Sequence, residues 1–150
     1  MNSEVDVVAR MTAAWEIETL IRRFALLNDA GDADALAALF TLDGSFARPS
    51  EPERPARGRE AIAAHFRDRP KRLTRHLVSN IVVDLAGPTA ARAQSYLVLY
   101  TAPFGSPTPA IADPIQFIGG FDDRLVREDG AWRFAERRGS LALKITPPAA

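Results

Sequence analysis

The sequence predicts an α+β fold in which about three N-terminal helices pack on the concave side of a curved antiparallel sheet that forms a cone. Apolar residues recur at helical spacing in the first part of the chain, and from residue 75 onward strand-like runs alternate with turn sequences. The chain has 150 residues, the usual size of one domain. We therefore expect a single domain over residues 1–150, with a core from about residue 7 to residue 145.

A long first helix is predicted over residues 7–28, because its apolar residues form one stripe along a helical surface. The helix should end before Gly31, since glycine tolerates the left-handed backbone that often follows a helix. Asp32 can then cap a short second helix over residues 33–40. The stripe consists of Met11, Ala14, Ile17, Leu20, Ile21, Phe24 and Leu27.

Short elements are expected between the second helix and the long strands. Residues 41–44 are typical of a turn, residues 45–47 of a brief strand, and residues 49–55 of a proline-rich loop. A third helix should begin at Gly58 and end at Pro70, because proline cannot continue a helix.

Four long strands complete the predicted sheet. A turn at residues 86–89, a loop at 102–114 and a hairpin turn at 128–130 separate them. The glycine pair at residues 119–120 indicates a bulge or bend within the third of these strands. The strands are predicted over residues 75–85, 90–101, 115–127 and 131–145.

Composition narrows the possible functions. Nineteen basic residues balance nineteen acidic ones, whereas a nucleic-acid-binding protein needs a clustered basic surplus. The absence of cysteine excludes disulfides, thiolate chemistry and cysteine-ligated iron–sulfur clusters in this chain. The first residues lack the features of a signal peptide, and no apolar run reaches the roughly 20 residues of a membrane span. We expect a cytoplasmic protein that binds neither nucleic acid nor membrane.

Specific residues within these predicted elements match a known family. The chain resembles the SnoaL-like families of the nuclear transport factor two-like superfamily, which include scytalone dehydratase-like, ketosteroid isomerase-like and dehydrochlorinase-like enzymes. The resemblance implies a cystatin-like cone whose open end forms a small-molecule pocket. The matching stretches are residues 17–32, 36–44, 58–62, 75–80 and 129–138.

The resemblance also implies a catalytic pair. In the catalytic members, an aspartate at the end of the first helix pairs with a histidine on the first long strand, and the matching residues are Asp29 and His76. A carboxylate bonded to one imidazole nitrogen would leave the other nitrogen as a base near neutral pH. Asp29 lies unfavourably near a helix C-terminus, where the dipole disfavours an acid. The alternatives are a structural histidine and a solvated aspartate.

Five further residues are candidates for binding the substrate. Scytalone dehydratase-like enzymes have a tyrosine where this chain has Asn28, and a second pocket histidine falls near Ser95; both departures argue against scytalone dehydration itself. Asn80 is expected on the same strand face as His76. Phe24 either lines the pocket or belongs to the core.

Arg138 is the fifth of these candidates. Strand alternation places it on one face with Trp132, Phe134 and Glu136, which suggests a core that grades into a polar pocket. Arg138 could hold an enolate or carboxylate oxygen, or it could pair with Glu136.

The most specific functional hypothesis is a cofactor-independent lyase or isomerase that acts on a small, mostly apolar cyclic substrate. The sequence lacks the glycine-rich nucleotide motifs, and the only two histidines are separated by a helix end, so no cofactor and no metal are expected. The alternative is a non-catalytic ligand-binding protein, or the small subunit of a complex like the aromatic-ring-hydroxylating dioxygenases.

Apolar residues are also expected on the outer face of the sheet. Their exposure there would favour a homodimer or homotrimer, in which a second copy covers them. The candidates are Leu77, Ile81, Val83, Leu141 and Leu143.

Overall fold

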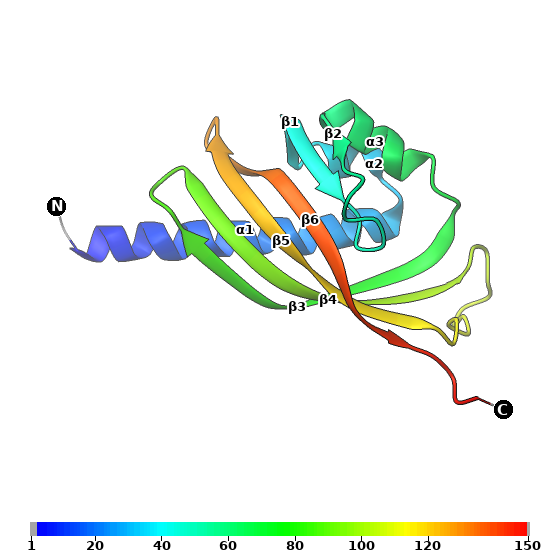
Figure 1. Cartoon of the computed structure of the whole chain (residues 1–150). Helices are drawn as coiled ribbons and strands as arrows, with labels where there is room; N and C mark the ends of the chain where they lie inside the picture. Colours follow the sequence, from blue (N-terminus) through cyan, green and yellow to red (C-terminus); the bar gives the residue numbers. More distant parts are fainter. Residues whose placement is uncertain (1–2, 150) are drawn as a thin grey trace.

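Three helices pack on an open six-stranded sheet in the computed structural model, which describes residues 3–149 (Figure 1). This arrangement confirms the predicted α+β class. The helices are α1 (Ser3–Ala30), α2 (Ala33–Ala37) and α3 (Arg59–Arg67). The strands, given in chain order, are β1 (Phe40–Ala47), β2 (Ala56–Arg57), β3 (Arg72–Leu85), β4 (Ala90–Pro103), β5 (Gln116–Glu128) and β6 (Ala131–Ile145).

The four long predicted strands are present as β3 to β6, and they form an antiparallel meander. The sheet order is β2-β1-β6-β5-β4-β3, so β3 lies at one edge beside α1 (Figure 1). The register of β5 against β6 shifts between Ile118 and Gly119, beside the predicted irregularity at residues 119–120. The extra residue is Ala142, so this bulge belongs to β6 and not to the strand that carries the glycine pair.

The prediction for residues 41–44 was wrong: they belong to β1 and do not form a separate turn. β1 runs parallel to β6, which makes the sheet mixed where a wholly antiparallel one was predicted. The turn-like sequence coincides with a register shift between Phe40 and Ser45, so its glycine is accommodated as an irregularity within a strand. Because Phe40 already starts this strand, α2 is shorter than predicted and ends at Ala37.

The stripe of α1 supplies one side of the core. Ile17 and Ile21 are fully buried, and Phe24 is 3% exposed. Met11, predicted to belong to the stripe, is 68% exposed, because the N-terminal turns of α1 extend past the sheet (Figure 1). No helix in the described part of the chain is both long enough and apolar enough to cross a membrane.

Phe24 lies at the centre of an aromatic cluster that fills the space between α1 and the sheet. Five phenylalanine rings surround it, with centroid distances between 5.6 and 6.1 Å. Most of these pairs meet edge to face, the arrangement that aromatic quadrupoles prefer. The five neighbours are Phe40, Phe46, Phe66, Phe121 and Phe134.

A bulge in β3 changes which residues face the core. The register against β4 shifts within residues 79–82, and Asn80 adopts a φ of 51°. One extra residue exchanges the two faces of a strand. Ile81 and Val83, predicted on the outer face, therefore pack against the core. Asn80 is exposed and does not share the inner face with His76.

A second bulge acts in the same way on β6. Ala135 has no partner in the register with β5, and the faces are exchanged beyond it. Arg137 therefore points inward and is 1% exposed. Arg138, predicted to share a face with Phe134, is exposed instead and forms an ion pair with Glu53.

Gly120 of β5 lies close to the backbone of β4, and this contact yields a stability prediction. A Cβ at this position would lie 2.6 Å from the carbonyl oxygen of Ser95, which is backbone and cannot rotate away. We expect Gly120→Ala to lower the free energy of unfolding by about 1–3 kcal/mol, measured by urea denaturation. Ser140→Ala, on the exposed residue opposite Gly120, should change it by less than about 0.5 kcal/mol. Equal effects of the two substitutions would contradict this account.

Candidate active site

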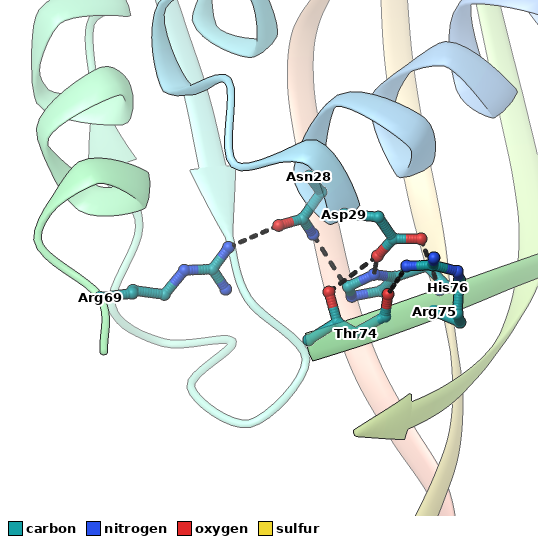
Figure 2. A network of polar contacts seen from close by, with 6 residues as sticks. All are labelled: Asn28, Asp29, Arg69, Thr74, Arg75 and His76. Carbon is teal, nitrogen blue, oxygen red and sulfur yellow. Dashed lines mark hydrogen bonds and ion pairs between the residues drawn. The ribbon is translucent and has the colours of Figure 1, made fainter. Parts of the chain in front are cut away.

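The Asp29 carboxylate joins the end of α1 to the first half of β3 (Figure 2). Its Oδ1 accepts hydrogen bonds from His76 Nδ1 at 2.5 Å and from Thr74 Oγ1 at 2.9 Å. Its Oδ2 accepts a hydrogen bond from the backbone N–H of His76 at 3.0 Å. The structure thus brings together the two residues of the predicted pair, and their side chains are only 11% and 12% exposed.

These contacts determine the charge of Asp29. Burial by itself would raise the pKa of the Asp29 carboxyl, but the hydrogen bonds from His76, the attraction of its ring and the bond from Thr74 together outweigh burial. The pKa of Asp29 therefore lies below its ordinary value, and the group is a carboxylate at neutral pH. A carboxylate in this position orients the imidazole and stabilises a proton on it.

Asn28 and Arg69 complete the hydrogen-bond chain on the other side of the imidazole. Arg69 donates from Nη2 to Asn28 Oδ1 at 2.9 Å, which leaves the Asn28 amide nitrogen facing His76 Nε2 at 3.3 Å (Figure 2). Because an amide nitrogen can only donate, Nε2 must be the acceptor and Nδ1 carries the proton. The network therefore selects the neutral tautomer whose lone pair is on Nε2.

Sequence reasoning did not identify Arg69 as a site residue. It follows α3 directly, and its guanidinium lies 4.3 Å from the centroid of the Phe66 ring. Burial, with a contribution from nearby Arg48, lowers the pKa of Arg69 to about 10, so it remains a cation at neutral pH. Arg69 reaches Asn28 because α3 packs on α2 and places Phe66 against Phe24 of α1, and no local sequence signal marks that contact.

The other predicted binding residues are divided between the interior and the surface. Phe24 and Ser95 are inside, at 3% and 2% exposure. The two bulges place Asn80 and Arg138 outside, and the structure does not bring them to the Asp29–His76 pair.

An interior ion pair was also missed by sequence reasoning. Arg137 Nη1 lies 2.6 Å from Asp123 Oδ2, and both side chains are at most 1% exposed. Burial raises the pKa of Asp123 to about 6 in spite of the attraction of Arg137, and burial lowers the pKa of Arg137. Strand alternation alone places Asp123 on the inner face with Phe121 and Leu125. It places Arg137 on that face only if the position of the bulge at Ala135 is known.

Two hollows in the part of the chain that the structure describes lie away from the Asp29–His76 pair. A hollow of about 180 Å³ lies beside β1, β2 and β6, where Ser45, Arg57 and Glu136 are among its walls. A smaller one of about 20 Å³ adjoins Asn28 and Phe66. Neither is lined by Asp29 or His76, and the predicted open cone is filled around Phe24 by aromatic rings.

Comparison with known families gives one match over most of the chain. The model of a SnoaL-like domain matches residues 9–138. A comparison with curated proteins gives no match.

Solved structures share the fold over nearly the full length. A candidate scytalone dehydratase from Novosphingobium aromaticivorans superposes with a TM-score of 0.78 at 23% identity, over 96% of this chain and 93% of that one. An NTF2-like protein with a cystatin-like fold from the same species gives 0.72 at 25% identity, over 94% and 91%. A Catenulispora acidiphila protein in complex with S-DNPA gives 0.68 at 27% identity, over 87% and 94%.

The lowered pKa of Asp29 predicts a pH-dependent contribution to stability. A carboxyl whose pKa is lower in the folded state stabilises the fold above its unfolded pKa, and this stabilisation is lost as the pH falls through the folded pKa. We expect Asp29→Asn to lower the free energy of unfolding by about 1–3 kcal/mol at pH 7. The difference from the unsubstituted protein should shrink below about pH 4. Urea denaturation at several pH values measures both effects.

Asp34→Asn is the matched control for this prediction. Asp34 also has a charged partner, Arg67, at 2.7 Å, but the Asp34 side chain is 81% exposed. Surface pairs of this kind contribute about 0.2–1 kcal/mol. If Asp29→Asn were no more destabilising than Asp34→Asn, or if its effect did not change with pH, the carboxylate would not have the structural role described above.

Proposed function

Because this chain belongs to the SnoaL-like domain family, we propose that it is a cofactor-independent lyase or isomerase in which His76, oriented by Asp29, removes a proton from a small, mostly apolar cyclic substrate. The observation that carries the proposal is the 2.5 Å contact between Asp29 and His76 Nδ1, with Nε2 left as the acceptor. A neutral imidazole whose Nε2 lone pair is held only by the long contact with Asn28, and which has a carboxylate behind it, is an arrangement that suits general-base catalysis.

The contact of Asn28 with His76 suggests how a substrate reaches the base. At 3.3 Å this N–H···N contact is a long hydrogen bond, so a substrate C–H group can replace it at small cost. A proton next to a carbonyl is acidic enough for a histidine to remove. Nε2 takes this proton, the electron pair moves onto the carbonyl oxygen, and the Asp29 carboxylate stabilises the imidazolium that results.

Asn28 then becomes a donor for the oxyanion. Its amide N–H groups are released from His76, while Arg69 still holds its oxygen at 2.9 Å. A donor aimed at developing charge contributes most in a site with little water. Loss of a leaving group from the enolate gives a lyase, and return of the proton to another carbon gives an isomerase.

Relatives support a small-molecule ligand. The Catenulispora acidiphila protein, 27% identical to this chain, is crystallised with the small molecule S-DNPA. The likeness to the candidate scytalone dehydratase, at 23% identity, supports the fold alone.

The filled interior favours a second candidate function. Phe24 and its five aromatic neighbours occupy the space that a substrate would need. A protein without catalysis that acts as the small subunit of a dioxygenase-like complex requires no such space, whereas a ligand-binding protein would require it as an enzyme does.

A second copy of this chain is the proposed partner at the outer face of the sheet. Leu77, Val98, Ile118 and Leu143 lie in register across four adjacent strands. Leu77 and Leu143 at the two ends of this row are 55% and 59% exposed. An apolar row of this kind supports a homodimer or homotrimer. Leu141, predicted on the same face, lies instead in the inner row with Gly119 and the core residue Leu97, because the register of β6 shifts between Leu141 and Leu143.

Proton exchange into a simple ketone tests the proposed catalysis. With 2-tetralone in D2O, we expect the protein to accelerate replacement of the acidic C1 protons by deuterium, followed by proton NMR. His76→Gln should lower the protein-catalysed rate by about 10²–10⁴-fold, the usual contribution of a general base.

His65→Gln is the control for this experiment. His65 lies on α3 against Phe46 and Phe66 and makes no contact with Asp29 or His76 in the described structure. Its substitution should leave the exchange rate within about twofold, well inside the effect expected for a general base. If neither histidine affects the rate, or if the protein does not accelerate exchange at all, the second candidate function is favoured.

The proposed oligomer is tested by mass in solution. Light scattering after size exclusion should give two or three times the mass of one chain. Leu77→Glu combined with Leu143→Glu should give the single-chain mass, because two carboxylates would be buried in the interface. Glu128→Arg, at the β5–β6 hairpin, should have no effect. A single-chain mass for the unsubstituted protein would remove this proposal.

A further inference from the structure

The hollow of about 180 Å³ lies on the outer face of the sheet, where β1 runs between β2 and β6 (Figure 1). Phe46 and Arg137 pair across β1 and β6 and are buried on the inner face. Side chains of a strand point alternately to its two faces, so the residues before them, Ser45 and Glu136, point outward and line the hollow. The sheet therefore separates this space, which we call the outer hollow, from the aromatic core and from the candidate active site.

The segment between β1 and β2 forms one wall of the outer hollow. Pro52 and Pro55 of this segment line the space, and the ring of each proline fixes one backbone dihedral. The N–H groups of Glu51 and Arg54 donate to carbonyl oxygens three residues earlier, at 3.0 and 3.1 Å, which holds the segment in turns. The wall is thus formed before any ligand arrives, and a preformed wall loses little conformational entropy when a ligand binds.

Four charged side chains surround the outer hollow, two of each sign. Arg138 and Glu53 form an ion pair at 2.6 Å. Arg57 and Glu136 have no such partner within residues 3–149. Because the four charges sum to zero, a ligand with one charge meets as much repulsion as attraction. A ligand with both charges can place each of them next to its opposite.

The two unpaired charges lie on either side of Ser45. In the register, Ser45 is opposite Arg57 on β2 and opposite Glu136 on β6. Neighbouring strands are about 4.8 Å apart, so about 9.6 Å separates the backbones that carry the two charged side chains. A small group with a carboxylate at one side and an ammonium at the other fits between them, and the Ser45 hydroxyl below it can donate or accept a hydrogen bond.

We propose that the outer hollow binds a small zwitterion that carries its ammonium and its carboxylate on the same carbon atom, the chemistry of a free α-amino acid. The ligand carboxylate accepts hydrogen bonds from the Arg57 guanidinium, and the ligand ammonium donates to the Glu136 carboxylate. A volume of 180 Å³ corresponds to about six water molecules at about 30 Å³ each, so the amino acid has a short side chain. Because the hollow lies on the outer face, this binding and the proposed function do not depend on each other.

Three probes with closely similar skeletons test the binding. L-alanine carries both charges, propionate lacks the ammonium, and ethylamine lacks the carboxylate. We expect L-alanine to bind at millimolar concentration in an NMR titration and to shift the amide resonances of β1, β2 and β6. Propionate and ethylamine should each bind at least about tenfold more weakly, because each leaves one charge of the hollow without its charge-assisted hydrogen bond.

Substitution of the two unpaired charges locates the ligand. Arg57→Gln and Glu136→Gln should each weaken the binding of L-alanine by about tenfold or more. In Glu136→Gln the preference for L-alanine over propionate should also fall to about one, since the partner of the ammonium is gone. Both side chains are exposed, so both variants should keep the melting temperature of the unsubstituted protein.

Asp84 and Arg92 provide the matched control. They lie opposite each other on β3 and β4, are likewise exposed, and do not line the outer hollow. Arg92→Gln and Asp84→Asn should leave the dissociation constant of L-alanine within about twofold, as expected for charges outside the binding site. His76→Gln, on the other side of the sheet, should leave it unchanged as well.

Four results would overturn the proposal. The first is no binding of L-alanine at millimolar concentration, and the second is equal binding of L-alanine and either singly charged probe. The third is equal weakening by the Arg57→Gln and Arg92→Gln substitutions, which would indicate a general effect of surface charge. The fourth is loss of L-alanine binding in His76→Gln, which would place the ligand at the candidate active site.

Discussion

The carboxylate of Asp29 is the point on which the arrangement of α1 and β3 depends. Its two oxygens accept three hydrogen bonds from two residues of β3, and this fixes the end of a 28-residue helix on the edge strand of the sheet. The hydrogen bond to Oδ2 comes from the backbone N–H of His76, so it joins α1 to β3 independently of the orientation or protonation of the imidazole. The other two bonds set the orientation of His76. One side chain thus serves the fold and the candidate chemistry together.

The hydrogen-bond chain extends this constraint to a third element. Through Asn28, the position of His76 Nε2 depends on Arg69, which follows α3. The cation is held against Phe66, and that ring belongs to the cluster around Phe24. A chain of direct contacts from Phe24 through Phe66, Arg69 and Asn28 therefore connects the packing of the aromatic core with the tautomer of His76.

The sequence predicted the fold class and the order of the long elements, because helical spacing and turn residues can be recognised within short stretches of sequence. It predicted the contact between Asp29 and His76 through the family resemblance, which matches whole motifs. It failed where a single extra residue alters a strand. Strand alternation placed Asn80 and Arg138 inside, and one bulge in each strand reversed both assignments. The position of a bulge depends on which side chains pack on each face of the strand and on how the strand pairs with a neighbour distant in sequence. Local sequence does not contain this information. The sequence likewise predicts a turn at residues 41–44, because the strand that pairs with them, β6, lies at the other end of the chain.

The pairing of β1 with β6 also has a consequence for biosynthesis. Phe40 faces Phe134 across this parallel pair, so most of the chain must be made before the contact can form. During translation the N-terminal helices and β1 leave the ribosome with apolar faces whose partners do not yet exist. The nascent chain therefore exposes these apolar faces until its last strand emerges. Pairing of β1 with β6 ends this exposure. This pairing is expected to be slow, because contacts between residues far apart in sequence form slowly.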